Sequence, residues 1–276
     1  MSADRYAVVG HPVAHSRSPF IHERFAHQTG QSMTYSRIDA APAQFESVVK
    51  RFFAEGGKGL NVTLPQKQAA AILADELTPR ARTAGAVNTL ARQDDGRLLG
   101  DNTDGAGLAR DLLNNLRVTI AGRRVLLLGA GGAARGVLAP LLGLKPAELT
   151  VANRTPDRAR ELAAGFAAFG ECRGCGFEDA RRGPYDVIIN ATSASLASEV
   201  PPLPPGAVGN RTFCYDMAYG ADDTSFVRWA QAQGAARTAM GLGMLVEQAA
   251  ESFHLWRGVR PDTASVIAAL KAELRS

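Results

Sequence analysis

Polar side chains gather in four short clusters within the first 105 residues, where predicted strands end. The clusters are His15–Pro19, Asn61–Lys67, Asn88–Thr89 and Asp101–Gly105. Taken singly, each cluster is more often helix capping or turn chemistry. Together they supply donors for an anion, and donors and acceptors for alcohol groups. Their convergence on the loops of one α/β unit therefore favours a binding site for a polyhydroxylated carboxylate.

Two titratable residues in these clusters are suited to proton transfer. Lys67 and Asp104 form the one obvious acid–base pair. We expect no metal site, because the single C-x-x-C, formed by Cys172 and Cys175, has no second pair of ligands to complete it. We interpret that spacing as coincidental rather than as a redox pair or half a zinc site.

A glycine-rich segment indicates a dinucleotide. It fits the pattern G-x-G-x-x-A, between a predicted strand and a predicted helix, and consists of Gly129, Ala130, Gly131, Gly132, Ala133 and Ala134. The first glycine permits a tight turn, the second lets the backbone approach a pyrophosphate, and the last alanine keeps helix and strand close. The helix N-terminus supplies N–H groups for the anion. The bare pattern also fits an ordinary turn, but this context favours a cofactor site.

The residues after the next predicted strand bear on the choice between NAD and NADP. Asn153, Arg154 and Thr155 stand where an NAD enzyme usually has an acidic residue for the ribose 2′-hydroxyl, and Arg158 follows in the next helix. Guanidinium groups match a phosphate in charge and in hydrogen-bond geometry. The alternative is a pair of ordinary surface arginines. The position of the pair leads us to predict NADP.

Composition excludes several classes of protein. Of the 276 residues, 46% are hydrophobic and 21% are charged, which suits a packed core and disfavours disorder. No apolar run is long enough for a membrane span, and the charged N-terminus does not resemble a signal peptide, so we expect a cytoplasmic protein. The formal charge of +4 is scattered, which disfavours nucleic-acid binding.

The predicted elements alternate between strands and helices with short connections, which favours parallel sheets. We expect strands at Tyr6–Gly10, Thr34–Asp39, Gly59–Leu64, Val125–Leu128, Leu149–Ala152, Tyr185–Asn190 and Phe213–Asp216. We expect helices at Pro19–Gln28, Pro42–Ala54, from Pro65, and at Gly105–Leu116, Ala133–Leu144, Pro156–Phe169, Met244–Arg257 and Thr263–Leu274. The turn dipeptide Asp95-Gly96 breaks this rhythm and predicts a hairpin.

This order predicts two α/β domains. Residues 1–104 with 240–276 would form a substrate-binding catalytic domain, to which the C-terminal helices return. Residues 105–239 would form a doubly wound, Rossmann-type domain for NADP. A cleft between the two is the natural place for a shared ligand.

Many motifs in one order show that the chain resembles the shikimate dehydrogenase family from Tyr6 to the C-terminal helices. The motifs are GHPVAHSRSPFIH, GLNVTLPQK, AGAVNTL, GDNTDGAG, LGAGGAARG, ANRT, INAT, YDMAY and GLGMLVEQA. The resemblance implies reversible reduction of 3-dehydroshikimate to shikimate with NADPH, in the pathway to chorismate and the aromatic amino acids. It also implies a monomer or a homodimer.

The resemblance implies roles for particular residues. The acid–base residue would be Lys67, paired with Asp104. The substrate carboxylate would be bound by Ser16, Ser18 and Tyr219, and the ring hydroxyls would be contacted, or the site ordered, by Asn61, Thr63, Asn88, Asp104 and Gln248. The nicotinamide side of the cofactor would lie against Met217 and Gly241, and the 2′-phosphate near Arg154.

Some positions depart from the family pattern, and two other functions remain open. Met240 stands where Asp is common, Glu23 where Asn is frequent, and Ser225 where Pro is usual. None of them falls on the proton-transfer pair. One alternative function is a quinate/shikimate dehydrogenase with relaxed cofactor use. The other is a catalytically silent NADP-binding protein of the same fold.

Overall fold

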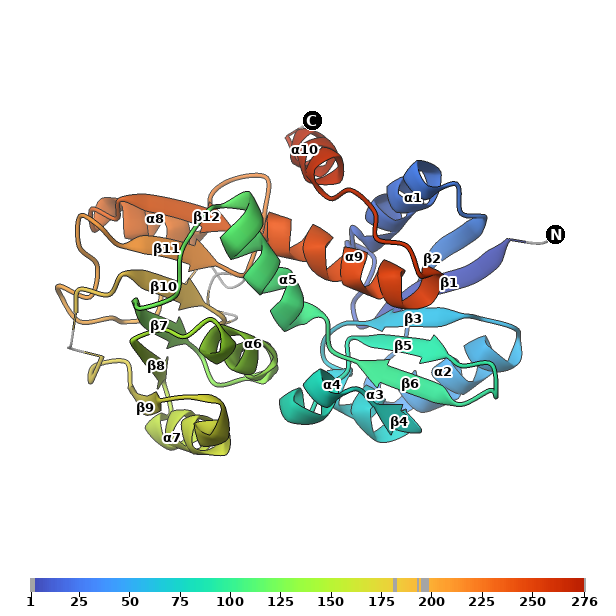
Figure 1. Cartoon of the computed structure of the whole chain (residues 1–276), viewed down its shortest axis with the longest axis horizontal. Helices are drawn as coiled ribbons and strands as arrows, with labels where there is room; N and C mark the ends of the chain where they lie inside the picture. Colours follow the sequence, from blue (N-terminus) through green and yellow to red (C-terminus); the bar gives the residue numbers. More distant parts are fainter. Residues whose placement is uncertain (1–2, 181–182, 193, 195–198, 276) are drawn as a thin grey trace. The chain divides into compact units, whose positions relative to one another are not determined.

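The computed structural model describes residues 3–180, 183–192, 194 and 199–275. The chain divides into two compact units. Unit 1 contains Met1–Gly107 and Val246–Glu273, and unit 2 contains Leu108–Leu245 and Leu274–Ser276 (Figure 1). Among the described residues, none of the helices combines the length and the apolar character that a membrane span requires.

The sheet of unit 1 has six strands in the order β2-β1-β3-β5-β6-β4. The strands are β1 (Asp4–Gly10), β2 (Met33–Asp39), β3 (Gly59–Val62), β4 (Glu76–Leu77), β5 (Thr89–Arg92) and β6 (Leu98–Asp101). β1 pairs in parallel with β2 and β3. β5 runs antiparallel to both β3 and β6, so this sheet is mixed rather than parallel. The hairpin predicted at Asp95-Gly96 is confirmed, with Gly96 at a φ of 89°.

Seven helices contribute to unit 1 over its described residues. They are α1 (Ser18–Thr29), α2 (Phe45–Ala54), α3 (Lys67–Leu73), α4 (Pro79–Ala84), the first half of α5 (Asp104–Arg110), most of α9 (Leu242–Arg257) and α10 (Ala264–Glu273). Local signals explain their ends. Pro19 stands in the first turn of α1, and Gly30 closes the helix in the left-handed conformation. Thr78 caps α4 by accepting a hydrogen bond from the backbone N–H of Ala81.

The sheet of unit 2 has six strands in the order β12-β11-β10-β7-β8-β9, and every pairing is parallel. The strands are β7 (Arg124–Leu128), β8 (Glu148–Asn153), β9 (Cys172–Gly176), β10 (Val187–Asn190), β11 (Phe213–Asp216) and β12 (Arg237–Met240). The helices α6 (Gly132–Gly143), α7 (Pro156–Gly165) and α8 (Ser225–Ala232) connect them. This order is that of the predicted doubly wound fold.

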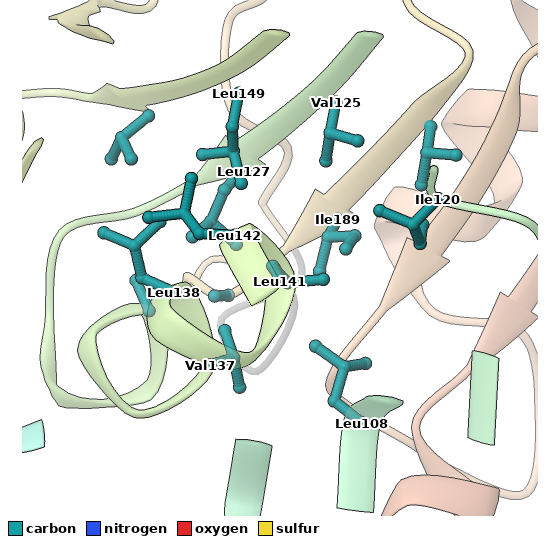
Figure 2. Close-up of a cluster of buried hydrophobic side chains, with 14 of the residues drawn as sticks. Leu108, Ile120, Val125, Leu127, Val137, Leu138, Leu141, Leu142, Leu149 and Ile189 are labelled. Carbon is teal, nitrogen blue, oxygen red and sulfur yellow. The ribbon is translucent and has the colours of Figure 1, made fainter. Parts of the chain in front are cut away.

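Both faces of this parallel sheet are buried. Val125 and Leu127 of β7 belong to one hydrophobic cluster, which Val137, Leu138 and Leu141 of α6 complete (Figure 2). The alternate residues of β7 belong to a second cluster with β10 and α8. Because a parallel strand covered on both faces has no polar side, its sequence is a continuous apolar run, as at Val125–Leu128 of β7.

The two cysteines of the C-x-x-C lie on β9 and serve different cores. Cys172 packs against the first cluster and Cys175 belongs to the second. Burial raises the pKa of the Cys172 thiol to about 12. Cys172 is partly buried and Cys175 buried, and two thiols packed in different cores do not form a redox pair.

Several elements differ from the sequence prediction. The short strands β4, β9 and β12 and the helices α4 and α8 were not predicted. The helix expected through Leu116 changes to a π-helical turn at Asp111–Asn115, and the helix expected from Pro65 begins at Lys67. The helix expected through Phe169 ends at Gly165 and is followed by a 3₁₀ turn. The predicted roles of the domains stay predictions.

Candidate active site

The predicted proton-transfer pair lies together in unit 1. Lys67 is the first residue of α3 and Asp104 the first of α5. The Lys67 ammonium donates to Asp104 Oδ2 at 2.5 Å, and the two side chains are 22% and 11% exposed. A charge-assisted hydrogen bond of this kind fixes both side chains. The remaining exposure leaves the pair accessible to a small molecule.

Asn88 holds the other oxygen of this carboxylate. Its Nδ2 donates to Asp104 Oδ1 at 2.8 Å, and its Oδ1 accepts from the backbone N–H of Thr103 at 2.9 Å. A backbone N–H can only donate, so Oδ1 must face Thr103 and the amide nitrogen must face Asp104. Asn88 is 2% exposed, and this orientation is therefore fixed inside the protein. Asp104 is held on both sides, by Lys67 and by Asn88.

Asn61, on β3, is oriented in the same way. Its Nδ2 lies 3.3 Å from the backbone carbonyl of Asn88, which can only accept, so Oδ1 points the other way. That oxygen accepts a hydrogen bond from the hydroxyl of Tyr35 at 2.7 Å. Asn61 is 6% exposed and Asn88 2%, so their contact lies in the interior of unit 1, and the partly buried Tyr35 joins it through its hydroxyl.

Three buried hydroxyls connect these amides to α9. Ser252 Oγ accepts from Asn61 Nδ2 at 2.9 Å and lies 2.7 Å from Thr89 Oγ1. Thr103 Oγ1 accepts from Asn88 Nδ2 at 2.8 Å. Gln248, one helical turn before Ser252, places its Oε1 3.2 Å from Asn88 Nδ2. The predicted residues Asn61, Asn88, Asp104 and Gln248 thus belong to one network with Lys67.

A second network anchors the segment that carries Asp104. Asp101, at the end of β6, accepts from Arg80 Nε at 2.7 Å and from the Thr78 hydroxyl at 2.6 Å. Burial favours its neutral form, but the hydrogen bonds and charge of Arg80 lower the pKa of Asp101 below its usual value. Arg80 also pairs with Glu251 of α9. These contacts fix the end of β6, three residues before Asp104.

The predicted carboxylate-binding serines lie at the start of α1. Ser16 Oγ donates to Ser18 Oγ at 3.2 Å and accepts from the backbone N–H of Ser18. Arg37 holds this turn from β2, because its Nε and Nη2 donate to the backbone carbonyl of Ser16 at 2.9 and 2.6 Å. Thr63 is half-buried in the loop after β3, against Gly10. Two hydroxyls and a nearby guanidinium are suited to an anion.

The glycine segment of unit 2 fits a dinucleotide. Gly129 follows β7 with a φ of 104°, and a Cβ there would stand 3.2 Å from the Ala191 carbonyl, so only glycine suits the turn. A Cβ at Gly131 or Gly132 would meet nothing within 4 Å, which leaves the backbone open to an approaching group. α6 begins at Gly132 without a side-chain cap. Its first N–H groups are available to a pyrophosphate.

The predicted 2′-phosphate residues follow β8 in the same unit. Asn153 Nδ2 donates to the backbone carbonyl of Thr155 at 3.0 Å, which shapes the turn before α7. Arg154 and Arg158 are exposed, and in the described part of the chain neither guanidinium has an ion-pair partner. No acidic residue stands at Asn153–Thr155. The local charge is suited to a phosphate.

The structure also brings together the two residues predicted beside the nicotinamide. A Cβ on Gly241 would lie 2.3 Å from the carbonyl oxygen of Met217, so the two backbones touch at the ends of β11 and β12. Asp216 orders the start of this loop by accepting from Asn190 Nδ2 and from the backbone N–H of Ala218, both at 3.1 Å. Tyr219 is half-buried in the loop that follows.

Sequence reasoning missed two members of the unit 1 network. Ser252 stands four residues after Gln248, which places both on one face of α9, and this spacing is a signal that could have found it. Tyr35 has no such signal, because an alternating strand residue carries no sign of its partner. Over the described ranges, no group of three or more His, Cys, Asp or Glu side chains could hold a metal ion.

Three models of known protein families match segments of the sequence. Residues 8–90 match the model of the shikimate dehydrogenase substrate-binding domain, 108–198 that of shikimate/quinate 5-dehydrogenase, and 241–271 that of the shikimate 5′-dehydrogenase C-terminal domain. The chain is 54% identical to a shikimate dehydrogenase (NADP(+)) of Saccharophagus degradans over 97% of its length and 99% of the relative's. It is 59% identical to that of Thioalkalivibrio sulfidiphilus, over 97% and 98%.

A solved structure resembles the whole chain. It is shikimate 5-dehydrogenase from Thermus thermophilus in complex with NADP(H) and shikimate, with a TM-score of 0.87 and 36% identity. The match covers 98% of this chain and 100% of the other.

Proposed function

Because the chain belongs to the shikimate dehydrogenase family, we propose that it catalyses the reversible, NADPH-dependent reduction of 3-dehydroshikimate to shikimate. The observation that carries the proposal is the Lys67–Asp104 pair, held by Asn88 within a network of buried amides and hydroxyls. Such a network suits a substrate with a carboxylate and several alcohols.

The chain's own residues supply proton transfer and orientation. When bound, NADPH supplies the hydride that reaches the C3 carbonyl carbon. The C3 oxygen gains negative charge, and Lys67 stabilises that charge and donates a proton to the oxygen. Asp104 keeps the Lys67 ammonium in place, and Asn88 keeps Asp104 in place. In the reverse direction Lys67 accepts the proton of the C3 hydroxyl.

Other residues bind the two reactants. Ser16 and Ser18 bind the substrate carboxylate, helped by Tyr219, while Asn61, Thr63 and Gln248 contact or order the ring hydroxyls. In unit 2 the glycine segment would hold the pyrophosphate of NADP, Arg154 and Arg158 its 2′-phosphate, and Met217 and Gly241 its nicotinamide. The fit of these residues to NADP rests on the open backbone at Gly131 and on the absence of an acidic residue at Asn153–Thr155.

The test is a rate comparison with two substrates and two cofactors. We expect NADPH formation with shikimate and NADP to exceed by far the rates with quinate or with NAD. Comparable rates with quinate would favour a quinate/shikimate dehydrogenase, and no turnover with either substrate would favour a silent NADP-binding protein. The cytoplasmic location and the monomeric or dimeric state stay predictions.

A further inference from the structure

Tyr35 lies in unit 1, at the centre of β2, and its ring packs on uncharged aromatic groups. The ring stacks on His22 at 4.3 Å between centroids and 6° between planes, and lies 6.4 Å from Trp256. Burial lowers the pKa of His22 to about 3, so its imidazole is neutral in this stack. The stack on His22 thus holds the phenol ring in one position, with its hydroxyl directed at Asn61.

The hydroxyl of Tyr35 is a permanent donor. Burial raises the pKa of the Tyr35 phenol well above its usual value, although a hydrogen bond with Ser18 and the charge of Arg37 act against this. The phenol therefore keeps its proton at every working pH. Its proton goes to Asn61 Oδ1, because the orientation of Asn61 leaves that atom an acceptor.

Tyr35 therefore contacts the predicted substrate site through Asn61, which is predicted to face the ring hydroxyls. We infer that Tyr35 is a positioning residue for substrate binding, whose hydroxyl fixes the amide of Asn61. This inference rests on the proposed function for the identity of the substrate.

The test removes one oxygen atom. Tyr35→Phe keeps the ring and its stack on His22, but leaves Asn61 Oδ1 without the hydrogen bond from Tyr35. The matched control is Tyr6→Phe, since Tyr6 is the register partner of Tyr35 on β1 and also packs on Trp256. The Tyr6 hydroxyl bonds Arg257 instead of a predicted substrate residue.

We expect Tyr35→Phe to raise the KM for shikimate about 3- to 10-fold, the value of one buried neutral hydrogen bond. The misplaced Asn61 amide weakens binding of the substrate and of the transition state equally, so kcat should change less than about 2-fold. The KM for NADP should not change. Tyr6→Phe should leave all three constants at their wild-type values. An unchanged KM in Tyr35→Phe, or equal effects of the two variants, would overturn the inference.

A second measurement needs no substrate. The side-chain amide signals of Asn61 in an NMR spectrum, identified by their loss in Asn61→Ala, should shift in Tyr35→Phe and stay in place in Tyr6→Phe. If the wild type does not oxidise shikimate, the proposed function fails and these signals still decide the role of Tyr35. Unshifted signals in Tyr35→Phe would refute the positioning role.

Discussion

Replacing the side-chain nitrogen of Asn88 with oxygen tests the contact through which this amide holds Asp104. In Asn88→Asp the group facing Asp104 Oδ1 at 2.8 Å changes from a donor to a carboxylate oxygen. The backbone N–H of Thr103 keeps its acceptor, while the donations of the amide to Thr103 Oγ1 and Gln248 Oε1 are lost as well. The two carboxyl groups are then held side by side in a buried position, where Asn88 is 2% and Asp104 8% exposed.

The structure sets the size of the effect. Two like charges about 4 Å apart repel by about 4 kcal/mol at the effective dielectric constant of a protein site. Lys67, on the other oxygen of Asp104, offsets part of this, so we expect a loss of about 2–4 kcal/mol in unfolding free energy at pH 8. A proton shared by the pair removes the repulsion, so the pair keeps that proton to a higher pH than a lone aspartate does.

The folded pair of the variant binds its shared proton more tightly than the unfolded chain, where an aspartate has a pKa of about 3.9. Stability is therefore retained below about pH 4 and lost as the pH rises above that value. Relative to wild type, the variant should be weakened far more at pH 8 than at pH 4.5.

The assay is urea unfolding of both proteins at the two pH values, in a Trp229→Phe background so that Trp256 reports unit 1. Asn190→Asp is a matched variant in unit 2, where Asn190 Nδ2 lies 3.1 Å from Asp216 Oδ1 and both residues are fully buried. In a Trp256→Phe background it should show the same pH-dependent loss, reported by Trp229. An Asn88→Asp protein that loses equally little at both pH values would refute the close, buried contact between residue 88 and Asp104.

Three further predictions concern binding and catalysis. Arg154→Ala should weaken NADP binding by about one to two decades and leave NAD binding nearly unchanged, because a charge-assisted hydrogen bond to the 2′-phosphate is worth roughly 1.5–3 kcal/mol. Arg158→Ala should weaken NADP binding less. An equal loss of affinity for both cofactors in steady-state kinetics would mean that Arg154 has a structural role. Ser16→Ala and Ser18→Ala should raise the KM for shikimate with kcat largely kept, and a loss confined to kcat would move the serines to the reacting centre. Asp104→Asn should lower kcat. In the double variant with Lys67→Ala, the loss of kcat should be smaller than the product of the two single losses. A loss equal to that product would mean that the two residues act independently.

The elements that sequence predicted best have strong local patterns. β7 and β11 are apolar runs, and α6 follows the glycine segment, so their period and punctuation identify them. β9 and β12 lie at the two edges of the unit 2 sheet and have mixed polarity, because an edge strand is covered less than a central one. α8 did carry a signal, the cap residue Thr224 before Phe226 and Val227, which the prediction passed over.

The candidate site was likewise predictable from the sequence only in part. Lys67 and Asp104 begin helices and Asn88 precedes β5, all in segments with distinctive residue types, and the structure brings them together. Which partner each amide faces depends on contacts between residues far apart in the chain. Asn61 meets Ser252 across 191 residues and Tyr35 across 26, and no local pattern encodes such pairs. The orientation of the network could be read only from the fold.

The most direct test of the account is the turnover of Lys67→Ala. With saturating shikimate and NADP, the rate of NADPH formation should fall about 10²- to 10⁴-fold, the usual contribution of a positioned acid–base group. NADP affinity, measured in the same preparation, should stay near the wild-type value, because Lys67 lies in unit 1 and the predicted NADP residues in unit 2. A variant with near-wild-type turnover would contradict the central claim that Lys67 transfers the proton.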